Sequence, residues 1–127
     1  MEKPKSLIIN SPFVVPHQHW IEGKGGVLEV KPERRPASYE VFDARNNTRR
    51  VEMLGLVNTI RSRVDAWRDA GWPGVTSVTR QLLEHWRERG EWDSEGKCWI
   101  GGPRQYPFYF CQLEAIESLC YLLSLLA

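Results

Sequence analysis

The chain has 127 residues, of which 42% are hydrophobic and 26% are charged. This length and composition are typical of a folded domain, and they exclude a disordered tail and a complete helicase, polymerase or kinase. The 17 basic and 16 acidic residues leave a net charge of +1. No field of one sign extends over the whole protein, so any basic binding site must be local.

The cysteines and the two ends of the chain predict a cytoplasmic location. Cys98, Cys111 and Cys120 are odd in number and have apolar neighbours, which fits a reducing compartment better than a disulfide framework. The few apolar residues before Asn10 are too short a run for a signal peptide. The apolar run at 119–127 is shorter than the roughly 20 residues that span a bilayer, so we expect no membrane contact.

In chain order, the first predicted elements are short, irregular strands. Three runs rich in β-branched and aromatic residues, at 7–9, 27–30 and 39–42, are separated by prolines and glycines. Prolines and glycines at such positions end strands and form turns. We therefore expect short strands in the first third of the chain.

The next predicted elements are two helices, arranged as a helical hairpin at about 49–90. Apolar residues recur at spacings of three and four from residue 51 to Gly71, and charged residues (Arg61, Arg63, Asp65 and Arg68) occupy the opposite face. Thr76 is expected to cap the second helix, which ends near Gly90. The predicted buried sides are Leu54, Val57, Ile60, Val64 and Trp67 in the first helix and Val78, Leu82, Leu83 and Trp86 in the second.

A polar loop at 91–103 is followed by a helix predicted at about 112–126, which is apolar on nearly every side. One of its faces is predicted to carry Leu113, Ile116, Cys120 and Leu123, and a second apolar face Leu119, Leu122, Leu125 and Leu126. Covering both faces needs more protein than the preceding residues provide. The sequence therefore predicts an α+β fold in which short strands precede a helical hairpin and an apolar helix.

We predict no metal site in this chain. His17, His19, His85 and Cys98 are zinc-ligand types, but no CxxC or HxxxH spacing accompanies them. His19 and Trp20 are expected to anchor a loop instead.

We also predict no catalytic residue. No GxSxG elbow marks a nucleophile, and the glycines at 23–26 and 101–102 match neither GxxxxGK[ST] nor GxGxxG, so the chain has no P-loop. Glu114 and Glu117 lie three residues apart on one helix face, as an acid–base pair could. Such pairs are usually solvated, and we expect both carboxylates to lie on the surface.

Arginines gather in the middle of the chain and are candidates for contact with the phosphates of DNA. Acidic neighbours such as Glu40 and Glu52 could neutralise much of this charge, so a solvated surface is the alternative. The candidate DNA-binding residues are Arg34, Arg35, Arg49, Arg50 and Arg61.

Several short motifs stand in an order that resembles a known family. They are IINSPF at 8–13, HW at 19–20, ERRPA at 33–37, VN at 57–58, VDAWR at 64–68, GVT at 74–76, HW at 85–86, FCQ at 110–112 and EAIE at 114–117. Together they resemble the N-terminal region of DEAD/DEAH-box (superfamily 2) helicase-like proteins related to the restriction subunit of type III restriction-modification systems.

The resemblance implies that residues 1–107 form an N-terminal accessory domain and that 108–127 begin a truncated RecA-like motor domain. It also implies that Gln112 corresponds to a Q-motif glutamine, whose amide pairs with adenine, with Phe110, Tyr109 or Trp99 as candidates to stack on the base. The parent protein would be an ATP-dependent DNA helicase or restriction endonuclease that uses ATP and Mg²⁺. This chain would contribute contacts to DNA or to the motor, with a methyltransferase subunit as a further partner, and would have no activity alone.

A different class of function is the alternative. The chain could be a small stand-alone interaction module whose apolar C-terminal helix docks on a partner protein or forms a homodimer. In that case it would bind neither nucleotide nor DNA.

Overall fold

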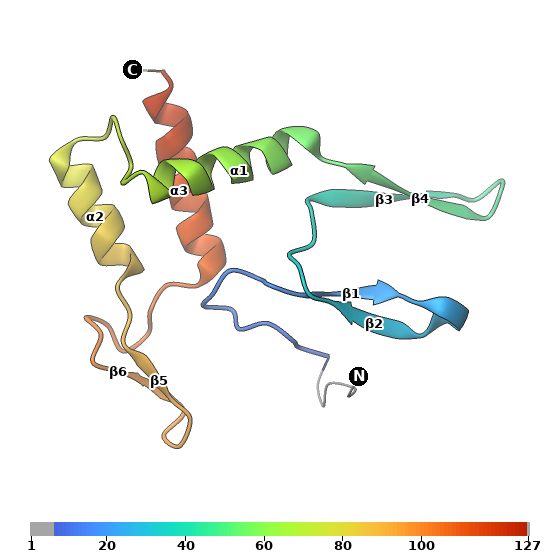
Figure 1. The fold of residues 1–127 in the computed structure, drawn as a ribbon, viewed down its shortest axis with the longest axis horizontal. Helices are drawn as coiled ribbons and strands as arrows, with labels where there is room; N and C mark the ends of the chain where they lie inside the picture. The colour runs from blue at the N-terminus through green and yellow to red at the C-terminus, as the bar shows by residue number, and fades with distance from the viewer. Residues whose placement is uncertain (1–6, 127) are drawn as a thin grey trace.

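The computed structural model describes residues 7–126 and has an α+β fold (Figure 1), which confirms the predicted class. Three antiparallel hairpins pair β1 (His19–Glu22) with β2 (Leu28–Lys31), β3 (Ser38–Asp43) with β4 (Thr48–Met53), and β5 (Glu91–Asp93) with β6 (Cys98–Ile100). The helices are α1 (Gly55–Asp69), α2 (Ser77–Arg87) and α3 (Phe110–Ser124), and a single 3-10 turn (Lys24–Gly26) connects β1 to β2.

The hydrophobic core lies where α1 and α2 each pack against α3. Its buried side chains are Val64, Trp67, Trp72, Leu83 and Tyr121. The rings of Trp67 and Tyr121 meet edge to face, with their centroids 5.5 Å apart. Each helix thus contributes one or two buried residues to a small core, and α3 is its central element because both other helices pack against it.

A tight turn after α1 brings Trp72 into this core. Gly71 and Trp72 both have a positive φ, of 83° and 54°, and this pair of left-handed residues reverses the chain. The indole N–H of Trp67 donates to the carbonyl oxygen of Pro73 at 3.0 Å and fastens the turn to α1. Trp72 is therefore a core residue, although it lies outside both predicted helices.

The hairpins extend from the helices and pair only within themselves across residues 7–126 (Figure 1). The β3–β4 hairpin is tied to α1 at its base, where the Asn58 side chain accepts from the N–H of Ala37 at 2.8 Å and donates to its carbonyl oxygen at 3.1 Å. The β5–β6 hairpin needs glycine at both of its ends. A Cβ atom on Gly90 would lie 1.9 Å from the carbonyl oxygen of Ile100, and one on Gly102 would lie 2.3 Å from the nitrogen of Gly90.

Several predicted boundaries need correction. Residues 7–9 form no strand, and 49–53 lie in β4 rather than in the first helix, which begins at Gly55. The predicted loop at 91–103 contains the β5–β6 hairpin. The predicted strands at 27–30 and 39–42 correspond to β2 and β3, and Thr76 caps α2 as expected, because its Oγ1 accepts from the N–H of Thr79 at 3.2 Å.

Some of the residues predicted to be buried are exposed. Val78 is 64% exposed and Leu82 41%, so α2 buries only Leu83 fully, with Trp86 partly covered. Leu54 and Val57, near the start of α1, are each 39% exposed, because this end of α1 extends beyond the core. Among residues 7–126 no helix is both long and apolar enough to cross a bilayer.

Candidate functional site

A buried carboxylate lies at the junction of the three helices. Glu117, on the core-facing side of α3, is 2% exposed. It is in line with Leu113 and Tyr121, four residues before and after it, and this stripe faces α1 and α2. The prediction that Glu117 lies on the surface is therefore wrong.

Three partners compensate this buried charge. The indole N–H of Trp72 donates to Oε2 of Glu117 at 3.1 Å, and the guanidinium of Arg87 donates to Oε1. Nε of Arg68 lies 3.8 Å from Oε2. A buried carboxylate needs such partners, because moving its charge out of water without them costs on the order of several kcal/mol. Arg68 was expected on the solvent face, yet its side chain is only 22% exposed, because it turns toward Glu117 and also pairs with Asp65.

The second predicted carboxylate, Glu114, is part of a structural ion pair. Its two oxygens accept from the two terminal nitrogens of Arg34, at 2.7 and 2.9 Å. The Arg34 guanidinium also lies over the ring of Phe110, 5.2 Å from its centroid. Arg34, a predicted DNA contact, and Phe110, a predicted adenine contact, thus touch each other and fix the loop before β3 to the start of α3.

Gln112 lies in the first turn of α3 and is exposed. Its Oε1 accepts from the backbone N–H of Tyr109 at 3.0 Å, which caps the helix. Tyr109 in turn stacks on Phe13, with ring centroids 5.2 Å apart, and Phe13 meets Trp99 edge to face at 5.1 Å. The three side chains proposed near the base, Phe110, Tyr109 and Trp99, therefore lie around the N-terminal end of α3. The adenine contact itself stays a prediction.

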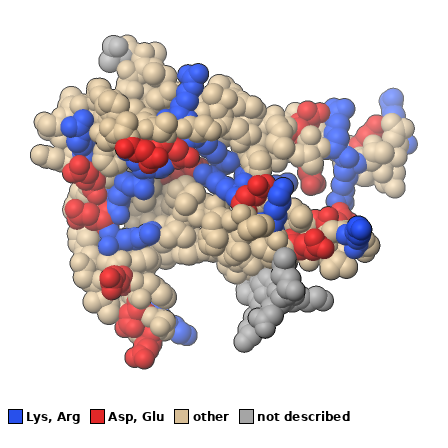
Figure 2. Space-filling model, in the orientation of Figure 1, with Lys and Arg blue, Asp and Glu red and all other residues tan. Residues whose placement is uncertain are grey.

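The remaining DNA-binding candidates differ in how free they are. The Arg61 guanidinium donates to the carbonyl oxygen of Arg35 at 3.4 Å, and its Nε is buried without a hydrogen-bond partner. Arg35 lies 4.0 Å from Glu40, and Arg50 pairs with Glu52 at 3.0 Å, both on the surface. Arg49 is exposed and forms no ion pair within residues 7–126. Figure 2 shows basic and acidic side chains mixed on the face it presents, which fits the near-zero net charge.

The outer side of α3 and the turn that follows it carry a leucine face, made of residues at positions i, i+3, i+4 and i+7, of which the last lies in the turn. These are Leu119 (59% exposed), Leu122 (42%), Leu123 (55%) and Leu126 (83%). Leu123 was expected to share a face with the buried residues, but it belongs to this exposed set. Large apolar side chains gathered on one helix face mark an interaction surface more often than scattered ones do.

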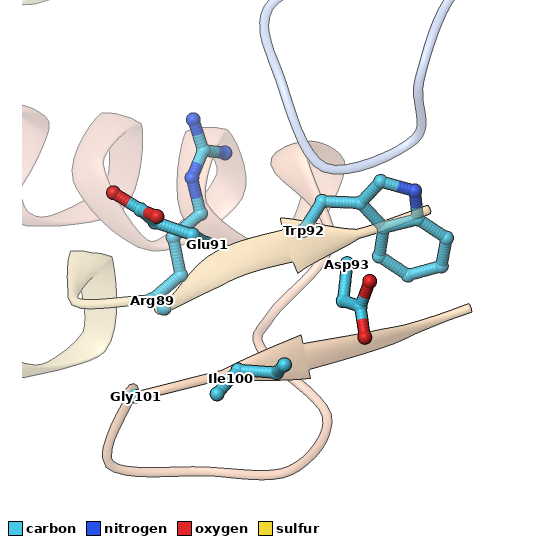
Figure 3. Close-up of a pocket in the computed structure, with 7 residues that line it drawn as sticks. Arg89, Glu91, Trp92, Asp93, Ile100 and Gly101 are labelled. Atoms are coloured by element: carbon cyan, nitrogen blue, oxygen red, sulfur yellow. The ribbon is translucent and has the colours of Figure 1, made fainter. Parts of the chain in front are cut away.

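Two open hollows flank Arg89. One, of about 680 Å³, lies beside the β5–β6 hairpin and is lined by Arg89, Gly90, Glu91, Trp92, Asp93, Ile100 and Gly101 (Figure 3). The other, of about 540 Å³, lies between the loop at 13–15 and the helices. Arg89 itself donates to the carbonyl oxygen of Phe13 and lies over the ring of Trp99. Because carboxylates and arginines line both hollows, neither has the single-sign charge that selects an ionic ligand.

His19 and Trp20 hold neighbouring segments, and of the cysteines Cys98 and Cys111 are exposed while Cys120 is partly buried. Nδ1 of His19 lies 2.7 Å from the carbonyl oxygen of Glu33, and the indole of Trp20 donates to that of Leu7 at 2.9 Å, so both hold neighbouring segments as expected. Over residues 7–126 no group of three or more His, Cys, Asp or Glu side chains could hold a metal ion. Burial and the nearby charge of Glu117 raise the pKa of the Cys120 thiol.

Comparisons with known proteins identify no relative. No family model, no curated protein and no solved structure matches the chain.

Sequence reasoning missed the residues that build the helix junction. Trp72 lies outside the predicted helices, and Arg87 was not singled out from the sequence. The signal that could have found Glu117 is its place in the apolar series Leu113, Glu117 and Tyr121, at spacings of four. A charged residue within such a stripe needs a partner, and the arginines of the other two helices are the ones available.

Proposed function

We propose that this chain is the N-terminal portion of an ATP-dependent DNA helicase or type III restriction endonuclease-like protein, and that it is not catalytic by itself. In this proposal α3 joins the chain to the motor domain, while other surfaces contact DNA. The proposal rests on the order of motifs from residue 8 to residue 117 and on one structural observation, the leucine face of α3.

The leucine face supports a docking role because α3 has two distinct apolar sides. One side, with Ile116 and Tyr121, is used in the core with α1 and α2. The other side, with Leu119 and Leu123, is 59% and 55% exposed, so covering it would recover about half of the roughly 1.5–3 kcal/mol that burying a fully exposed leucine contributes. A second protein layer over α3, such as a motor domain, would recover this free energy.

The capping contact of Gln112 is compatible with an adenine contact. A carboxamide oxygen has two lone pairs, and the Tyr109 N–H uses one of them. The second lone pair and the Nε2 hydrogens are the groups that pair with adenine N6 and N7.

In this proposal the whole protein uses ATP and Mg²⁺. Its partners are DNA and a methyltransferase subunit, and it acts in the cytoplasm.

Reading the coding DNA beyond the codon for Ala127 tests this proposal. Two RecA-like lobes need on the order of 1,500 bases. A P-loop followed by an acidic Mg²⁺ motif, in frame or one frameshift away, is the expected result. An unrelated gene directly after a stop codon would contradict the proposal.

The spacing of the leucine face favours a second candidate function, a stand-alone module that forms a homodimer. Positions i, i+3, i+4 and i+7 make a stripe that a second copy of α3 could cover. Sedimentation velocity tests it with Leu119→Glu/Leu123→Glu, and the control is Leu56→Glu, which changes a 75% exposed leucine on α1. This candidate is supported if the wild-type chain and the Leu56→Glu variant are dimers and the double variant is a monomer. A monomeric wild-type chain contradicts it.

A further inference from the structure

We propose that the distal end of the β3–β4 hairpin, residues 44–50, is a β-ribbon that binds the phosphates of duplex DNA. This inference rests on the proposed role in DNA processing and assigns the DNA contact to one element. It moves the contact away from Arg34 and Arg61, whose guanidinium groups are engaged within the protein.

The distal end of the hairpin is rich in hydrogen-bond donors. Residues 45–50 read Arg-Asn-Asn-Thr-Arg-Arg, six consecutive side chains that can donate hydrogen bonds, with no acidic residue among them. Arginine, asparagine and threonine are the side-chain types that contact phosphate oxygens. All residues from 44 to 51 are exposed, so the hairpin presents these donors to solvent.

The distal end of the hairpin also carries a local positive charge. Glu52 and Glu40 lie nearer the base of the hairpin and close to arginines, whereas the carboxylate of Asp43 lies at the turn, where three arginines at 45–50 outnumber it. Glu52 pairs with Arg50, Glu40 lies 4.0 Å from Arg35, and Asp43 accepts hydrogen bonds within the turn. Arg45 and Arg49 form no ion pair in the described part of the chain. The distal end is thus locally positive, although the protein carries only +1 overall.

Hydrogen bonds give the tip of the hairpin a defined shape. Oδ1 of Asp43 accepts from the N–H of Arg45 at 2.9 Å, and Oδ2 accepts from the side-chain amide of Asn46 at 2.8 Å. Asn47 adopts a positive φ of 51°, which closes the turn between paired residues Asp43 and Thr48. A preformed tip reduces the ordering cost of binding.

The hairpin has a size and an exposed position that suit the major groove of DNA. The hairpin is a two-stranded ribbon that points away from the helices (Figure 1), and the major groove of B-form DNA admits a ribbon of this kind. Exposed Phe42 lies opposite Arg49 on one face and gives the ribbon an apolar group for sugar or base edges, whereas Glu40, on the same face, lies nearer the base of the hairpin opposite Val51. The major groove of duplex RNA is too deep and narrow for side chains to read, which favours DNA.

Fluorescence anisotropy with a 20-base-pair DNA duplex tests the inference on the full 127-residue chain. Arg45→Ala/Arg49→Ala removes the two unpaired cations. If each contacts one phosphate, the slope of log affinity against log salt falls by about 2, and affinity at 0.1 M salt falls about 60-fold. Lys24→Ala/Arg63→Ala is the control, since it removes two exposed cations elsewhere on the protein. Arg45→Lys/Arg49→Lys keeps the charge and should keep the slope.

The outcomes separate this inference from the proposed function. Equal losses in the Arg45/Arg49 and Lys24/Arg63 variants would overturn the hairpin assignment while leaving DNA binding by the chain in place. Equal or tighter binding to an RNA duplex of the same sequence would overturn the assignment to DNA. No binding by the wild-type chain would overturn the inference, whereas the coding DNA beyond Ala127 decides the motor assignment independently. Melting temperatures of all variants should agree, because these side chains lie outside the core.

Discussion

The helices and the β3–β4 hairpin differ in how much of their surface they bury. The three helices and the turn after α1 contain Val64, Trp67, Trp72, Leu83, Glu117 and Tyr121, the buried residues of the core and its carboxylate. In the hairpin, by contrast, Phe42, Val51 and Met53 are 57%, 54% and 62% exposed. A two-stranded hairpin alone is marginally stable in water, so its strands contribute little to the free energy of unfolding.

This difference separates stability from recognition. The helices hold the fold through a small core and one buried ionic junction, and they leave the leucine face of α3 uncovered. The β3–β4 hairpin carries hydrogen-bond donors and charged side chains, and it contributes little to the stability of the fold. Substitutions should therefore have large effects on unfolding in the helices and small ones in the hairpin.

The largest expected change in the free energy of unfolding distinguishes two adjacent leucines of α2. Leu83→Ala should lower the free energy of unfolding by about 3 kcal/mol, because Leu83 is 2% exposed and its removal leaves a cavity. Leu82→Ala is the matched control. Leu82 is 41% exposed, and its loss should cost under about 1 kcal/mol. Urea denaturation measures both, and equal costs would show that α2 does not pack as described.

The next effect separates the two carboxylates of α3. Glu117→Gln should cost about 2 kcal/mol, because it weakens the hydrogen bonds of Arg87 and leaves its charge without a counterion. Glu114→Gln removes a partly exposed pair with Arg34 and should cost less than about 1 kcal/mol. Thermal or urea unfolding of the two variants compares them. A larger cost at Glu114 would place the structural junction at Arg34 instead.

The smallest effect concerns thiol reactivity. Cys120 should react with a thiol reagent near pH 8 more slowly than Cys98 or Cys111, because burial and the charge of Glu117 raise its pKa and so lower its thiolate fraction. Glu117→Gln should speed the reaction of Cys120, whereas Glu114→Gln should not. Mass spectrometry of the modified chain assigns each rate, and an unchanged Cys120 rate in Glu117→Gln would remove the electrostatic part of this explanation.

The sequence predicted the fold class well because its helices carry clear periodic signals. The stripe through Ile60, Val64 and Trp67 and the cap at Thr76 were both sufficient to locate a helix. The strand β4 was missed because residues 51–54 continue the apolar spacing of α1 into a segment that pairs with β3. Pairing between distant segments has no signature in local spacing.

The candidate site was harder to predict, for a physical reason. Whether an arginine is free or engaged depends on the groups that the fold brings near it, and Arg34 meets Glu114 across 80 positions of sequence. The composition therefore identifies the basic residues, but it does not indicate which of them are free to contact DNA. Arg49 of the hairpin, by contrast, forms no ion pair with any carboxylate of residues 7–126.

Hydrogen exchange on the wild-type chain tests the division between a packed helical core and a weakly held hairpin most directly. The account predicts that amides of α1 and α3 around Val64 and Tyr121 exchange only through global unfolding, while those of β3 and β4 exchange roughly 100-fold faster or more through local opening. Amides of β4 that exchange as slowly as those of α3 would contradict it, because the hairpin would then be part of the core.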